Sequence, residues 1–202
     1  MQEILIDLVN WWKKWRETVS LGISLTTWLL AILFTPMHLG LFRMATYWVM
    51  AIQLSYFLLP LFLCKLDWCF VYHEWRHVAR VCSILMFVIF WSIFIYDREL
   101  IFPAAADNVP GLNFLQHFLP PFLLLADQTV YIERPPRFLY PCVITSAYTA
   151  LIFVWYCVDN TWPYIFMRSL NFGSFQFLVI IALFLSWVIH NVLCYPFYAP
   201  RF

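Results

Sequence analysis

Thr46 and His117 are two polar residues within apolar segments of this chain, and their side chains together could catalyse a reaction there. A hydroxyl beside an imidazole is the minimum for nucleophilic catalysis, because the ring takes the proton while the oxygen attacks an acyl carbon. A single threonine in a membrane helix more often bonds back to a carbonyl one turn earlier. A lone buried histidine is likewise more often a packing residue, although such residues are functional candidates. Their shared depth, about one turn inside two apolar segments, favours the catalytic interpretation.

Both residues have polar neighbours on their own helical faces. Gln53 follows Thr46 by seven positions, and Asn113 precedes His117 by four, so each pair shares a face. An amide there can donate to an oxyanion or orient the imidazole. The amides with this potential role are Gln53, Asn108 and Asn113. The carboxylates that could hold the imidazole proton are Asp97, Glu99, Asp107 and Asp127, and the spacing does not choose among them.

A competing pattern is the run His73-Glu74-Trp75-Arg76-His77. Two histidines four apart with a glutamate after the first are typical of zinc hydrolases, in which the glutamate is the base. A catalytic zinc needs a third protein ligand. The residues that would have to supply it are Asp127, Glu133 and His190. Because Arg76 inside the motif disfavours a dication, we expect a solvated helix end in a charged loop and no metal site.

Composition shows what must position these side chains. Hydrophobic residues make up 64% of the 202 residues, charged residues only 11%, and the mean hydropathy is +0.78. A soluble domain is about half apolar and about a quarter charged, so the chain is predicted to lie in a membrane. A net charge of +1 gives no basic face for nucleic acid, and we expect no nucleic-acid partner.

Apolar runs long enough to cross about 30 Å of hydrocarbon predict an all-α bundle of six transmembrane helices. The predicted spans are Ser20–Gly40, Ala45–Cys64, Ala79–Tyr96, Asn113–Ile132, Phe138–Val158 and Ser174–Tyr195. The preceding segment, Gln2–Val19, combines helical apolar spacing with clustered tryptophans and basic residues, which is typical of a helix lying in the membrane interface. The predicted organisation is therefore an interfacial helix over residues 1–19 and one membrane domain over residues 20–202.

The distribution of Lys and Arg predicts the orientation. Cytoplasmic loops of membrane proteins carry an excess of these residues. With a cytoplasmic N-terminus, the inner segments hold Lys13, Lys14, Arg16, Lys65, Arg76, Arg80, Arg134, Arg137 and Arg201. The outer segments hold Arg43, Arg98 and Arg168. We therefore expect both termini in the cytoplasm and Thr46 and His117 near the outer face, in an endomembrane such as the endoplasmic reticulum or in the plasma membrane.

The third predicted span and the loop after it resemble a known family. The matching runs are Phe90-Trp91, Tyr96-Asp97-Arg98-Glu99, Ile101-Phe102-Pro103, Asp107-Asn108, Pro110-Gly111 and Leu112-Asn113, followed by His117. This pattern is similar to that of the androgen-induced, or FAR-17a, family. Arg43, Thr46 and Gln53 are similar to the family's basic residue, threonine and glutamine. Asp127 stands where the family commonly has glutamate.

The resemblance implies a six-span membrane hydrolase with a threonine nucleophile and a histidine. Its implied substrates are branched fatty acid esters of hydroxy fatty acids, and no cofactor is implied. Carried over to this chain, the nucleophile is Thr46 and the base is His117. Two alternatives remain open: a non-catalytic membrane protein that binds lipid or regulates a partner, and a zinc-dependent hydrolase using His73, Glu74 and His77.

Overall fold

The computed structural model describes residues 18–30, 45–63, 69–101, 116–126 and 136–194, together with Trp11, Trp15 and Leu33. Most of the predicted interfacial helix Gln2–Val19 lies outside these residues. Trp11 and Trp15 are helical and exposed. The interfacial placement of this segment stays a prediction.

The described residues form helices and no strand, which confirms the all-α class. The long elements are a helix over Thr18–Leu30, α2 (Ala45–Leu63), α3 (Cys69–Tyr96), α5 (Leu119–Ala126), α6 (Leu139–Asp159) and α7 (Phe172–Val188). Short 3-10 helices, η3 (Arg98–Leu100) and η5 (Ile165–Ser169), follow α3 and α6. A π-helical segment, η6 (Ile189–Cys194), continues α7.

Three of these helices are long and apolar enough to cross a membrane. They are Val71–Tyr96, Leu139–Asp159 and Phe172–Val192. The helices Thr18–Leu30 and Ala45–Leu59 are apolar but shorter. They overlap the first and second predicted spans, and α5 lies within the fourth. The protein is thus a helical membrane protein, and the count of six spans stays a prediction.

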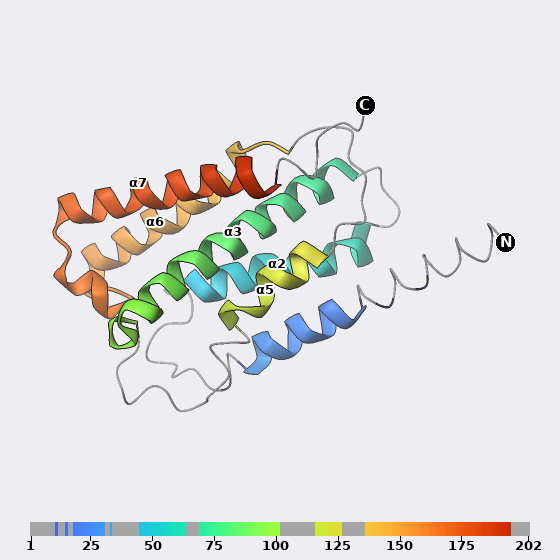
Figure 1. The fold of residues 1–202 in the computed structure, drawn as a ribbon, viewed down its shortest axis with the longest axis horizontal. Coiled ribbons are helices and arrows are strands. Elements are labelled where there is room, and N and C mark those ends of the chain that lie inside the picture. The colour runs from blue at the N-terminus through green and yellow to red at the C-terminus, as the bar shows by residue number, and fades with distance from the viewer. Residues whose placement is uncertain are drawn as a thin grey trace.

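Helix α3 runs through the centre of the bundle. It contacts α2, α5, α6, α7 and η6, and in Figure 1 it lies between the α6–α7 pair and the layer formed by α2 and α5. The main core cluster joins residues of α2, α3 and α5, including Tyr56, Phe90 and Leu124. Helices α6 and α7 instead expose large apolar side chains such as Phe177 and Phe184. Such a surface suits contact with lipid tails.

The charged run at the start of α3 was predicted as a solvated helix end, and that prediction is wrong. The helix begins at Cys69, ten residues before the predicted span. It buries five ionisable residues: His73, Glu74, Arg76, His77 and Arg80. The physical reason is pairing within the bundle, because buried charges need partners. The Arg80 Nε group donates to the Leu124 carbonyl oxygen at 3.0 Å, and the Glu74 carboxylate accepts from the Arg137 amide at 3.0 Å.

The connection between α6 and α7 reverses the chain in a few residues. Asn160 ends α6 in the left-handed conformation, with φ of 52°. Asparagine tolerates that region better than most residues. Asn171 then caps α7, accepting from the Ser174 amide at 2.8 Å. The segment between these two asparagines includes Tyr164. It lies near the end of the bundle where α2 begins.

Candidate active site

Thr46 lies in the first turn of α2 and is 5% exposed. The preceding residue, Ala45, donates its amide to the Tyr164 hydroxyl oxygen at 2.9 Å. Amides in the first turn of a helix have no partner within the helix, so a side-chain oxygen from elsewhere commonly satisfies them. Tyr164, which is 118 positions beyond Thr46 in the chain, therefore fixes the start of the helix that carries the candidate nucleophile.

The Tyr164 hydroxyl is the centre of a small polar cluster. Burial raises the pKa of Tyr164 above its ordinary value, and hydrogen bonds from Ala45, Tyr148 and Thr46 act in the opposite direction. The raised pKa keeps the hydroxyl protonated near neutral pH. A protonated hydroxyl that contacts both the backbone and the side chain of Thr46 can orient the Thr46 oxygen without carrying charge.

His117 is 3% exposed and lies flat against an aromatic ring of α3. Its ring is stacked on Phe90, with centroids 3.5 Å apart and planes 7° apart. Within the described part of the chain, its Nδ1 atom is buried without a hydrogen-bond partner. The orientation of the imidazole is therefore set by stacking on Phe90 from α3, and no described carboxylate accepts a hydrogen bond from Nδ1.

Thr46 and His117 are linked through one hydrophobic cluster. Phe90, on which His117 stacks, belongs to the main core cluster, and Ala45 and Tyr164 pack against that same cluster. Thr46 lies at the start of α2, whereas Phe90 lies near the end of α3, the helix that follows α2. Neighbours of both candidate residues therefore belong to one hydrophobic cluster, which joins α2 to α3.

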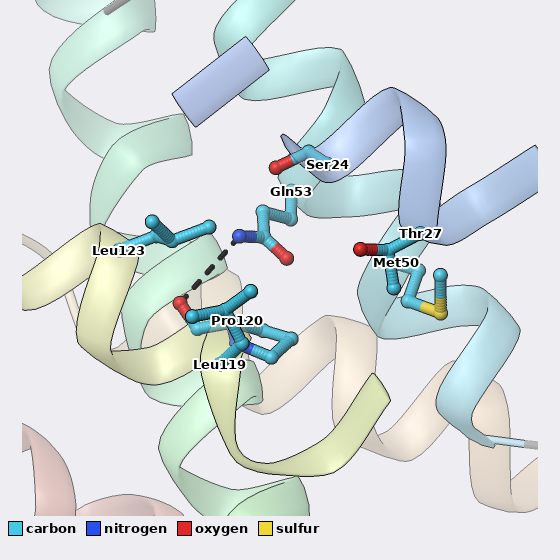
Figure 2. Close-up of a pocket in the computed structure, with 7 residues that line it drawn as sticks. All are labelled: Ser24, Thr27, Met50, Gln53, Leu119, Pro120 and Leu123. Atoms are coloured by element: carbon cyan, nitrogen blue, oxygen red, sulfur yellow. Dashed lines mark hydrogen bonds between the residues drawn. The ribbon is translucent and has the colours of Figure 1, made fainter. Parts of the chain in front are cut away.

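Gln53 is 2% exposed and joins α2 to the segment that carries His117. Its Nε2 atom donates to the Pro120 carbonyl oxygen at 3.5 Å, at the long end of the hydrogen-bond range. Seven residues correspond to roughly 10 Å along a helix, so Gln53 lies about two turns from Thr46. It lines a cavity between helices, shown in Figure 2.

The other site residues expected from sequence are placed as follows. Asp97 is exposed, and its carboxylate accepts from the Glu99 amide at 2.9 Å, capping η3. Its carboxylate thus has a local structural partner at the surface. The remaining four lie outside the described residues: Asp107, Asn108, Asn113 and Asp127.

The histidines of the zinc-hydrolase pattern lie in a separate cluster at the other end of α3. His77 Nε2 and His190 Nδ1 are 2.7 Å apart, so one ring donates to the other. The Glu74 carboxylate accepts from the Arg137 amide. Across the residues that the structure describes, no group of three or more His, Cys, Asp or Glu could hold a metal ion. His190, one of the three expected third ligands, does reach His77, as a hydrogen-bond partner.

Comparison with known proteins shows the family of this chain. The family model described as FAR-17a/AIG1-like protein matches residues 72–196, more than half of the chain. This chain belongs to the FAR-17a/AIG1-like family. The human protein named Androgen-induced gene 1 protein is 31% identical over 134 residues, which cover 58% of this chain and 56% of that relative. The chain thus aligns with little more than half the length of this relative. No solved structure matches the present chain.

The family match covers the two candidate residues unequally. His117, Phe90 and Tyr164 lie within residues 72–196, whereas Thr46 and Gln53 precede them. The matched residues therefore include His117 and do not extend to Thr46. Thr46 enters the site through its contact with Tyr164.

Sequence reasoning missed two side chains of this site. Phe90 was noted only as part of the family pattern, and Tyr164 was not singled out. A stacking partner on α3 cannot be found from spacing, because it depends on how the fourth segment packs. Tyr164 offered one weak signal, a tyrosine in a short aromatic loop between two predicted spans.

Proposed function

We propose that this protein is an intramembrane hydrolase of lipid esters, in which Thr46 is the nucleophile and His117 the base. The observations that carry the proposal are the burial of both residues and the hydrogen bond of Tyr164 to the start of the helix that carries Thr46. An alcohol and an imidazole in an apolar interior have the groups that acyl transfer requires. The family supports a substrate that is a fatty acid ester of a hydroxy fatty acid.

The reaction proceeds in two steps that balance without a metal or an organic cofactor. First, His117 takes the Thr46 proton, the Oγ–acyl bond forms and the ester C–O bond breaks. The protonated imidazole then gives its proton to the departing alcohol oxygen. Second, water attacks the acyl-threonine, His117 takes one water proton, and the acid leaves as Thr46 regains its proton.

The surroundings of Thr46 suit the transition state of this reaction. The Tyr164 hydroxyl lies beside Thr46 and accepts from the Ala45 amide at the N-terminus of α2. Donors at a helix N-terminus stabilise negative charge that develops on an oxyanion. Apolar helices would hold the acyl tails without polar recognition. The predicted orientation, with cytoplasmic termini and the site near the outer face, belongs to the same proposal.

Mutation of each residue tests the proposal in the purified full-length chain. We expect Thr46→Ala and His117→Ala each to lower ester cleavage by at least about a thousandfold, as loss of a nucleophile or its base does. Thr145→Ala is the matched control, because Thr145 is a buried threonine of α6 outside the site. Full activity in either site variant, with normal folding, would exclude this mechanism.

A second candidate function is lipid binding without catalysis. It is favoured by the Phe90 ring, which covers one face of His117 at 3.5 Å, an arrangement that also suits a packing histidine. A fluorophosphonate probe distinguishes the two functions, because it modifies Thr46 only if the oxygen is activated. Labelling that is lost in Thr46→Ala and in His117→Ala supports catalysis. Absence of labelling in a folded, lipid-binding protein supports the second candidate.

A further inference from the structure

A cavity between the helix Thr18–Leu30, α2 and α5 has polar groups that the proposed reaction does not use. Its empty volume is about 230 Å³, including space open to the surface, and it has room for about one water molecule. The lining residues are Ser24, Thr27, Met50, Gln53, Leu119, Pro120 and Leu123. Figure 2 shows the oxygen atoms of Ser24 and Thr27 turned toward the Gln53 amide.

Two of these polar groups have unused hydrogen-bonding capacity. Ser24 is 7% exposed, and within the described residues its buried hydroxyl has no hydrogen-bond partner. Gln53 has one long bond, at 3.5 Å to the Pro120 carbonyl, although an amide can make four hydrogen bonds. Thr27 already donates to the Ile23 carbonyl at 2.8 Å, which leaves its oxygen as an acceptor. Unsatisfied buried polar groups are costly, so a site of this kind favours a ligand that completes their bonds.

The chemistry of the lining selects the class of ligand. None of the lining residues is ionisable, so a carboxylate or phosphate would be desolvated in the cavity without a counter-charge. Ser24 and Gln53 both donate and accept, whereas the Thr27 oxygen accepts. The group that complements them is neutral and can both donate and accept a hydrogen bond. A hydroxyl group has these properties. The apolar side chains Met50, Leu119 and Leu123 suit an attached hydrocarbon chain.

We propose that this cavity is a binding site for the hydroxyl group of a neutral, long-chain lipid alcohol. The lipid hydroxyl occupies the space beside Ser24 and Gln53. The hydrocarbon chain of the lipid leaves through the side of the cavity that is open to the surface. Packing of Trp28 on Tyr47 and Met50, and of Leu21 on the main core cluster, holds the first helix in place as the cavity wall. The site does not depend on ester cleavage, because binding requires neither Thr46 nor His117.

Photolabelling tests this site in the full-length chain, reconstituted in phospholipid nanodiscs. The probe is hexadecanol with a diazirine near its hydroxyl end, and labelled residues are located by mass spectrometry. We expect saturable labelling of the segments around Ser24, Gln53 and Leu119. Excess unlabelled hexadecanol should displace the probe, whereas hexadecane and palmitate should not. Monopalmitoylglycerol is a separate competitor that reports whether an acylglycerol hydroxyl is accepted as well as a simple alcohol.

Three variants connect the labelling to the proposed contacts. Ser24→Ala and Gln53→Met should each weaken the competition by hexadecanol about threefold to tenfold, the effect of one lost hydrogen bond. Ser83→Ala is the matched control, since Ser83 is another buried serine of the described chain whose hydroxyl lacks a partner but which does not line the cavity. We expect its affinity to be unchanged.

The outcomes separate this inference from the proposed function. Equal competition by hexadecane and hexadecanol would overturn it, as would labelling insensitive to both Ser24 and Gln53. Failure to label the cavity would show that it holds only water, and would also overturn it. None of these results bears on ester cleavage, which is measured independently in the Thr46→Ala and His117→Ala variants.

Discussion

Replacing Tyr164 with phenylalanine removes one hydroxyl and keeps the ring that packs between the core clusters. The Ala45 amide, which donates to that hydroxyl at 2.9 Å, then has no partner from Tyr164 in a partly buried first turn. An unsatisfied amide of this kind costs about 1–2 kcal/mol, less than a fully buried group would. A chain of this size loses about 2–4 °C in melting temperature per kcal/mol, so we expect a fall of about 2–8 °C.

The same change should slow the proposed nucleophile. If the lost free energy is the energy that holds Thr46 in place, labelling of Thr46 by a fluorophosphonate should slow by about fivefold to thirtyfold. Thermal melting in detergent and the labelling rate are the two measurements. Tyr140→Phe is the control, because Tyr140 lies exposed in the first turn of α6.

The pH dependence of this effect has a definite sign. Because the pKa of Tyr164 is raised by burial, its hydroxyl stays protonated, and the difference in melting temperature should be constant from about pH 6 to about pH 9. Above about pH 10, Tyr164 ionises in the unfolded chain but stays protonated in the folded chain. The free energy of unfolding of the wild type therefore falls with pH only in that range. An unchanged melting temperature and labelling rate in Tyr164→Phe would refute the role of this hydroxyl.

Three further predictions concern positions outside the Thr46 cluster. Replacing His77 or His190 alone by leucine should cost about 1–3 kcal/mol, since each change removes one hydrogen-bond partner of a buried ring nitrogen, whereas the double variant should recover part of the loss. Thermal melting of the wild type and the three variants measures the coupling, and strict additivity would argue against the 2.7 Å bond. Asn171→Ala should cost about 1 kcal/mol by removing the cap of α7, and Asn171→Gly only a few tenths; equal losses would rule out the side-chain cap. Asp97→Ala should change ester cleavage less than about twofold, because an exposed cap contributes little away from its own turn, and a large loss of turnover would instead make it a functional carboxylate.

The sequence predicted the helices whose apolar runs are long and uninterrupted. The predicted span Phe138–Val158 agrees closely with α6, and Ser174–Tyr195 with α7 and η6. Hydropathy succeeds here because membrane helices satisfy their backbone internally and expose apolar side chains. It failed at the start of α3, where charged residues read as a loop. Those residues are buried because other helices supply partners. Such partners cannot be predicted from local composition.

The candidate site shows the same division. The burial of Thr46 and His117 could be predicted, because each falls within an apolar run. The groups that orient them could not. Tyr164 reaches Ala45 across 119 positions, and Phe90 meets His117 from another helix. For Asp97, the sequence left open a role beside the imidazole, whereas the structure gives its carboxylate a partner two residues away.

The π-helical segment η6 at the end of α7 carries His190, the residue that meets His77. A π turn accommodates one more residue than the α turn it replaces. Removing one residue of α7 ahead of this segment, with the winding unchanged, would rotate the imidazole by roughly 100° about the axis, away from α3. Removing one residue of the π turn itself can instead restore α winding, so the contact of His190 with His77 tolerates a change of chain length better inside η6 than in α7.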